Sequence, residues 1–172
     1  MDILENLFIG VVSGVVASAA FFLLLRRLRP DIEISPLIAK VTTGGYTYYD
    51  FKIINRSRRA AIDIRVHCVL ATPENVQGGP IYQTLGITLT KDTFFELGPY
   101  DRNDRDAYYA LRFTTVDDLD TLWKDDRSHV RLRIMATDSE SGFSRAFLRD
   151  FRTKRNSIHE GQHEFGDSLT VS

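Results

Sequence analysis

The pattern that most resembles a catalytic motif is His-Glu-Gly-Gln-His at residues 159–163. It matches H-E-x-x-H, in which two histidines one helical turn apart bind zinc and the glutamate acts as a general base. The sequence does not favour a helix here, because Gly161 costs about 1 kcal/mol relative to alanine. The flanking residues also lack the apolar periodicity of a buried helix. We therefore predict an exposed closing strand, with no catalytic residue, no metal site and no cofactor; a zinc hydrolase is the alternative.

Two groups of basic residues could in principle bind anions or nucleic acid. Arg56, Arg58 and Arg59 form a basic turn, which we interpret as a solvated loop. Phenylalanines alternate with arginines over 143–152, a pattern that single-strand-binding surfaces share with the buried strands of a sandwich. Because Lys and Arg total 22 against 23 Asp and Glu, we favour the buried strand and expect no nucleic-acid partner.

The chain has one cysteine, Cys68, so it forms no intrachain disulfide. Cys68 lies within an alternation of apolar and polar residues over 61–70, where a buried thiol packs as a small hydrophobic group. We predict a structural role for it.

An uncharged apolar run covers residues 6–25. A helix of 20 residues rises about 30 Å, which matches the hydrocarbon core of a bilayer. A cleaved signal peptide requires a basic region before the apolar run, whereas Asp2 and Glu5 precede this one. We predict a single transmembrane anchor.

Three arginines after the run, Arg26, Arg27 and Arg29, indicate its orientation. Basic residues are retained on the cytoplasmic side, so the N-terminus is expected outside the inner (plasma) membrane. We divide the chain into an anchor with its basic flank, residues 1–29, and a cytoplasmic domain, residues 30–172. The same arginines can contact anionic lipid headgroups, or can serve topology alone.

Small residues at Gly10, Gly14 and Ser18 repeat every four positions along the run. This spacing places them on one helix face and permits close approach of a second helix. It predicts self-association, and hence a homo-oligomer.

From residue 31 onward, short alternating segments are separated by turn residues, as in all-β domains. A short helix is expected over 115–124, capped by Thr115. About eight strands at this spacing predict a two-sheet, immunoglobulin-like sandwich. The predicted strands cover 31–42, 46–55, 61–72, 81–90, 93–98, 106–114, 129–137, 143–152 and 157–171.

The stretches LRPDIEISPLIAKV and YDFKIINRSRRAAIDIRVHCVL resemble the start of the cytoplasmic domain of inward-rectifier potassium channels. Further similarity lies in LGITLTKDTFFELGP, ATDSESGFSRAF and SIHEGQHEFGDSL, so the likeness covers roughly residues 29–169. It implies an immunoglobulin-like cytoplasmic sandwich that associates with copies of itself and has basic residues close to the membrane. The chain departs from those channels in having one apolar run and no TVGYG-like filter sequence, so the resemblance does not imply potassium conduction.

These features predict a non-enzymatic, membrane-anchored binding or sensor module that contacts lipid, a second copy and a cytosolic protein or small ligand. The alternative from a different class is an oligomeric membrane effector or pore component.

Overall fold

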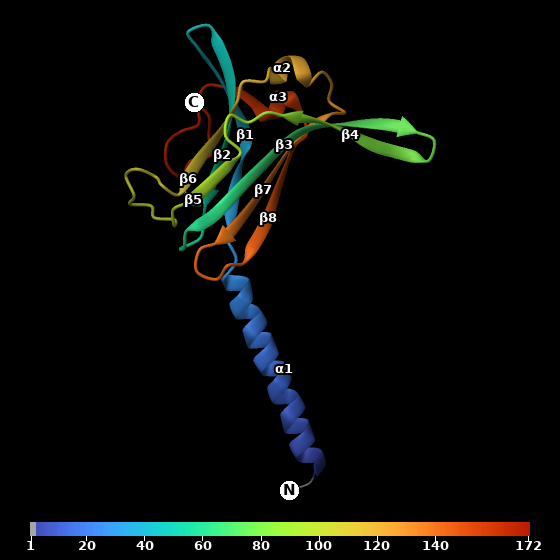
Figure 1. Cartoon of the computed structure of the whole chain (residues 1–172), viewed down its shortest axis with the longest axis vertical. Helices are drawn as coiled ribbons and strands as arrows, with labels where there is room; N and C mark the ends of the chain where they lie inside the picture. The colour runs from blue at the N-terminus through green and yellow to red at the C-terminus, as the bar shows by residue number, and fades with distance from the viewer. Residues whose placement is uncertain (1–2) are drawn as a thin grey trace.

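The computed structural model describes residues 3–172, with side chains described for residues 8–25 and 28–172. A long N-terminal helix leads into a β-sandwich built from two sheets (Figure 1). The elements, in chain order, are α1 (Ile3–Arg27), β1 (Ile32–Thr43), β2 (Tyr46–Asn55), β3 (Ala61–Val76), β4 (Gly79–Ile87), β5 (Thr93–Leu97), β6 (Ala110–Thr115), α2 (Leu119–Leu122), β7 (His129–Asp138), β8 (Ser144–Phe151), α3 (Lys154–Ser157) and β9 (Ile158–Glu160). The predicted fold class, an all-β sandwich preceded by one helix, is confirmed.

The helix α1 extends away from the sandwich (Figure 1). Its 25 residues correspond to a length of roughly 37 Å. The stretch Phe8–Leu25 has a mean hydropathy of 2.5, and none of it is buried by the rest of the chain. The helix is therefore long enough and apolar enough to cross a bilayer.

The first sheet has the strand order β6-β2-β1-β9, and β9 lies parallel to β1. The second sheet has the order β4-β3-β7-β8, and β5 also pairs with β3. Both sheets direct alternate side chains into a common core. The rings of Phe51 on β2 and Phe151 on β8 meet across this core, with their centroids 5.7 Å apart. Cys68 is buried in the same core, as predicted, and burial raises the pKa of its thiol to about 12.

The short helix is smaller than the sequence suggests. It covers Leu119–Leu122, and its N-cap is Asp118, whose carboxylate accepts hydrogen bonds from the backbone amides of Asp120 and Thr121. The Thr115 hydroxyl instead donates to the Thr88 carbonyl, at 2.7 Å. Capping by Thr115 was therefore wrong, because that hydroxyl has a tertiary partner.

Most of the predicted strand 157–171 is irregular. Only Ile158–Glu160 pairs with β1, as β9. Gly161 follows with φ of +122°, which residues with a side chain rarely adopt, and a Cβ atom there would lie 2.5 Å from the Ser172 carbonyl oxygen. The chain turns at this glycine, and its final segment folds back as an isolated bridge between His163 and Val171.

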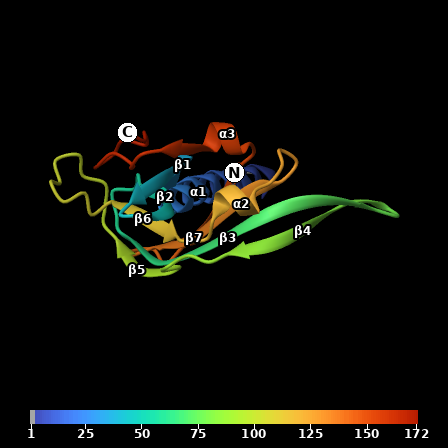
Figure 2. The same ribbon diagram turned by 90° about the horizontal axis from the view of Figure 1, so that it is seen from above.

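Strands β3 and β4 continue beyond the sandwich as a two-stranded arm, residues 72–86. The arm projects sideways from the body in both views (Figures 1 and 2). The sequence predicts a break from Pro73 to Pro80, yet the strands stay paired from Cys68 with Ile87 to Val76 with Gly79. Proline is compatible with this arm because prolines are tolerated where a strand edge is free.

Candidate functional site

The connection between α1 and the sandwich is short and anchored at its centre. Only residues 28–31 separate the helix from β1. The Leu28 amide donates to the carbonyls of Leu24 and Leu25, at 3.2 Å each, and so extends the last helical turn. Pro30, two residues later, is buried. The chain thus passes from helix to strand without a flexible linker.

The β7–β8 turn holds the end of the helix through Ser141. The Ser141 hydroxyl lies 2.6 Å from the Leu28 carbonyl oxygen and 2.9 Å from Asp138 Oδ1, and its single proton serves these two acceptors. Carbonyls at a helix end have no partner within the helix. Ser141 supplies one from the sandwich.

Asp138 positions this serine. Its side chain is fully buried, and it accepts hydrogen bonds from the amides of Glu140 and Ser141. Arg59 Nε lies 2.7 Å from Asp138 Oδ2 and 3.9 Å from a Glu140 carboxylate oxygen. Burial acts to raise the pKa of Asp138, but the hydrogen bonds from Ser141 and the charge of Arg59 together lower it below its ordinary value. The carboxylate is therefore ionised at neutral pH.

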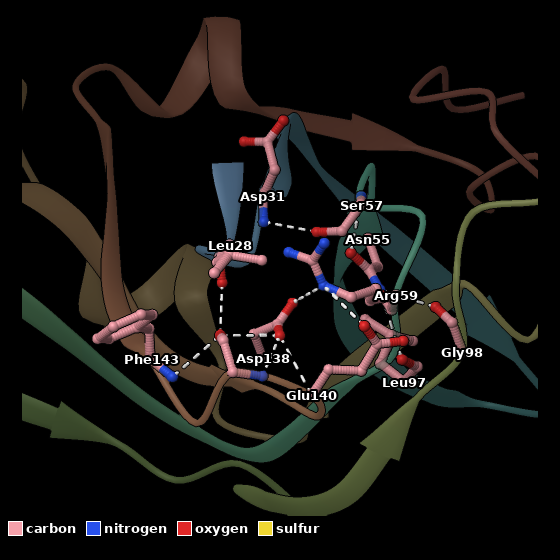
Figure 3. A network of polar contacts seen from close by, with 11 residues as sticks. Leu28, Asp31, Asn55, Ser57, Arg59, Leu97, Gly98, Asp138, Glu140 and Phe143 are labelled. Carbon is pink, nitrogen blue, oxygen red and sulfur yellow. Dashed lines mark hydrogen bonds and ion pairs between the residues drawn. The ribbon is translucent and has the colours of Figure 1, made fainter. Parts of the chain in front are cut away.

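The neighbouring β2–β3 turn is fixed by Asn55, which is completely buried. Its side-chain amide donates to the carbonyls of Arg59 and Gly98, at 2.8 Å each, and its oxygen accepts from the Ser57 amide. The Ser57 hydroxyl in turn accepts from the Asp31 amide, at 2.8 Å. The β7–β8 turn and the β2–β3 connection between the sheets thus hold the segment between helix and strand (Figure 3).

This arrangement can transmit movement between α1 and the sandwich, because hydrogen bonds to the β7–β8 turn and to the β2–β3 connection restrain the segment on either side of Pro30. The Ser141 hydroxyl, the Asp138 carboxylate and the Arg59 guanidinium bond one another. We describe this arrangement as the helix–sandwich junction: Leu28, Asp31, Asn55, Arg59, Asp138 and Ser141.

The residues predicted for helix association lie on the exposed surface of α1. A Cβ atom added at Gly10 or Gly14 would meet no atom within 4 Å. Ser18, on the next turn, is also exposed. The predicted face is therefore open along its length.

The predicted membrane-surface residues lie where α1 meets the sandwich. Arg29 is exposed beside the junction. Arg26 and Arg27 lie in the last turn of α1, and their side chains fall outside the described residues. Arg58, in the β2–β3 turn, is also exposed close to the junction.

The residues of the zinc-like motif are not arranged as zinc ligands. His159 is exposed, whereas His163 is 2 % exposed and its Nε2 lies 3.2 Å from the Asp50 carbonyl oxygen. The helix that would align the two rings is not formed. Among the described residues, no three His, Cys, Asp or Glu side chains are grouped so as to hold a metal ion.

The segment after this motif is held against the first sheet by Lys52. Its ammonium group donates to the carbonyls of Glu164 and Ser168, at 2.6 and 2.7 Å. Burial and the nearby charge of Arg112 lower the pKa of Lys52 to about 8. Arg112 donates to the His163 carbonyl, at 2.5 Å. These cations have a structural role that alternation along β2 does not reveal.

The junction was not predicted from the sequence. The basic turn that contains Arg59 was interpreted as a solvated loop, although Arg59 pairs with the buried Asp138. One local signal was present: Asp138 is followed by a serine- and glycine-rich turn, and aspartate side chains commonly bond the amides two and three residues ahead. No local pattern in the sequence identifies Arg59 as the partner of Asp138.

No family model matches the chain, and no curated protein matches it in sequence.

Proposed function

We propose that this protein is a single-pass, membrane-anchored binding or sensor module without enzymatic activity. Its N-terminus lies outside the plasma membrane and its sandwich faces the cytoplasm. It associates with copies of itself and presents the sandwich to a cytosolic protein or small ligand. In the same proposal, the sandwich is of the inward-rectifier cytoplasmic type, used without a pore.

The observation that carries this proposal is the helix–sandwich junction. A simple tether needs only a flexible linker, whereas here the Leu28 carbonyl is bonded to Ser141 within two residues of the buried Pro30. Through a rigid connection, the association of helices fixes the spacing of the sandwiches. In the other direction, binding at the sandwich can change the spacing of the helices. Such coupling is characteristic of a sensor, because both events bias one shared element.

The basic residues near the junction support the orientation and the contact with lipid. Arg29 and Arg58 are exposed at the end of the sandwich nearest α1, where a cytoplasmic leaflet would lie. Each basic side chain near an anionic surface contributes about 1 kcal/mol of attraction. In this proposal Arg26, Arg27 and Arg29 contact lipid headgroups and keep the junction at the membrane surface.

The open face of α1 supports self-association. Gly10, Gly14 and Ser18 leave space for a second helix, and an interface of small residues permits close backbone contact within lipid.

The mass of the full chain in lipid nanodiscs tests this proposal. We expect more than one copy per disc, and we expect Gly14→Leu to shift the population toward single copies by filling the open face. Ala19→Leu adds the same side chain on the opposite side of the helix and should leave the stoichiometry unchanged. A single copy per disc at every protein-to-lipid ratio would contradict the proposal.

A further inference from the structure

The second sheet ends in a strand that lacks the usual protection of a free edge. An edge strand exposes unpaired backbone amides and carbonyls, and soluble domains normally guard it with charged side chains, prolines, bulges or short length. The strand β4 spans nine residues, GPIYQTLGI, none of which is charged. It pairs with β3 without a register shift, so no bulge interrupts it. Its only proline is Pro80, next to its first residue.

The other edges of the two sheets are protected. Among the strands described, β5, β6, β8 and β9 also lie at sheet edges, and each carries at least one charged side chain: Glu96, Arg112, Arg145 and Glu160 are examples. On the arm itself, the free edge of β3 contains Pro73, which has no amide proton, and the charged Glu74. Among the edge strands described, β4 is therefore the one without a charged side chain.

One face of β4 continues the hydrophobic core into solvent. Ile87, at the base of the arm, is buried in the core. Alternation places Leu85 and Ile81 on the same face as Ile87, and they are 52 % and 47 % exposed. Within the sandwich this face is covered by the opposite sheet, but on the arm no second layer of the described chain covers it. The free edge and the uncovered face together form an interaction surface on β4.

We infer that β4 pairs antiparallel with β4 of a second copy of this chain. This inference rests on the self-association in the proposed function and names its contact surface on the sandwich. In a two-fold antiparallel pairing, the residue at the axis lies opposite its own counterpart, so a charge at the centre of the strand would face itself. The stretch 75–90 contains no charged residue, so no charged side chain on β4 itself opposes the approach of a second copy. The result is one continuous sheet through both chains.

The direction of the arm suits two chains in one membrane. The arm runs sideways relative to α1 in both views (Figures 1 and 2). The two-fold axis of an antiparallel pair is normal to the plane of the paired strands, so it follows the direction of α1 when that plane lies across α1. Both helices then enter the same bilayer side by side.

The test uses the full chain in nanodiscs and the variant Thr84→Lys. Thr84 is exposed near the middle of β4, and two introduced charges there would face each other across the pair. Like charges brought together at an interface cost several kcal/mol, so the sandwich contact should weaken about tenfold or more. Ala146→Lys, on the charged edge strand β8, is the matched control and should have no effect. Unchanged association in Thr84→Lys, with the wild-type chain still multimeric, overturns the β4 pairing but leaves helix-mediated association intact.

Cysteine cross-linking tests the same contact without depending on charge. Single cysteines are placed at positions 81–85, and the buried Cys68 leaves them as the reactive thiols. Directly opposed residues in antiparallel strands lie about 4.5–5.5 Å apart, within the range of a disulfide. We expect one position to form a disulfide-linked dimer efficiently, with yields that fall on either side, and no cross-link for Ala146→Cys. Equal cross-linking on β8, or none anywhere along β4, overturns the inference.

Discussion

The buried ring of His163 makes the sandwich sensitive to acid. The Asp50 carbonyl accepts from its Nε2, which fixes the proton on that nitrogen. Burial, together with the charges of Lys52 and Arg112, lowers the pKa of His163 to about 4. In the unfolded chain a histidine titrates at about 6.5. Between these values the unfolded state binds more protons than the folded state, so stability falls as the pH falls.

We therefore predict that the free energy of unfolding decreases from pH 7 to pH 4.5 by about 2 kcal/mol through this residue. Thermal unfolding of the detergent-solubilised chain across this range measures the effect. The variant His163→Gln should flatten the pH dependence, whereas His159→Gln, which changes the exposed histidine of the same motif, should retain it. Equal pH dependence in the two variants would contradict this account.

The pair formed by Asp138 and Arg59 stabilises the junction. Removing one partner of a buried ion pair leaves the other uncompensated and costs about 3 kcal/mol. We predict a loss of this size in the free energy of unfolding for Asp138→Asn, measured by chemical denaturation. Glu140→Gln, which changes the exposed neighbour, should stay within about 0.5 kcal/mol of wild type. Stability unchanged in Asp138→Asn would remove Asp138 from its structural role.

His163 and Arg59 also show what the sequence alone does not predict. The sequence predicted an exposed closing strand that contains His163, and the side chain of His163 is buried. The outer face of the first sheet is covered by the C-terminal segment, and alternation within a strand carries no information about what covers its outer face. The pairing of Arg59 with Asp138 joins residues 79 positions apart, which local pattern does not specify.

At the scale of elements, the sequence predicted a strand best where it lies between two regular strands of the sheet. The segment 46–55 was predicted as a strand and is β2, Tyr46–Asn55. The prediction failed at the arm, where Pro73 and Pro80 indicate a loop but lie on strands with free edges. It also failed after Glu160, where the left-handed Gly161 ends a strand that composition alone extends. The apolar helix was predicted from its composition, but its attachment through Ser141 was not.

The attachment of α1 leads to a prediction at this scale. In Ser141→Ala, the Leu28 carbonyl loses its partner in the sandwich, and the helix should reorient more freely. Spin labels at Ser18→Cys and Ala146→Cys report the distance between the two elements, and we expect its distribution to broaden. The loss of stability should be only about 1 kcal/mol, as for a single hydrogen bond.

Ser139→Ala is the matched control in the same turn, because the contact of Ser139 with the Ala60 carbonyl is made by its backbone amide. It should leave the distance distribution unchanged. If Ser141→Ala also leaves it unchanged, the junction does not depend on this hydroxyl.

At the scale of the whole molecule, we propose a distinct task for each of three surfaces. In this proposal the open face of α1 brings helices together, the exposed arginines near the junction contact the leaflet, and the edge of β4 joins sandwiches. The rigid junction makes these events interdependent, because a change in helix spacing alters the separation of the β4 strands. A flexible linker would leave them independent.

The proposed function requires that α1 spans a membrane and that the sandwich lies on its cytoplasmic side. Protease accessibility of the full chain in right-side-out and inverted plasma-membrane vesicles measures this. We predict that the sandwich survives protease added to right-side-out vesicles, is digested in inverted ones, and stays with the membrane in alkaline carbonate. Digestion of the sandwich in right-side-out vesicles, or its release by carbonate, would contradict the account.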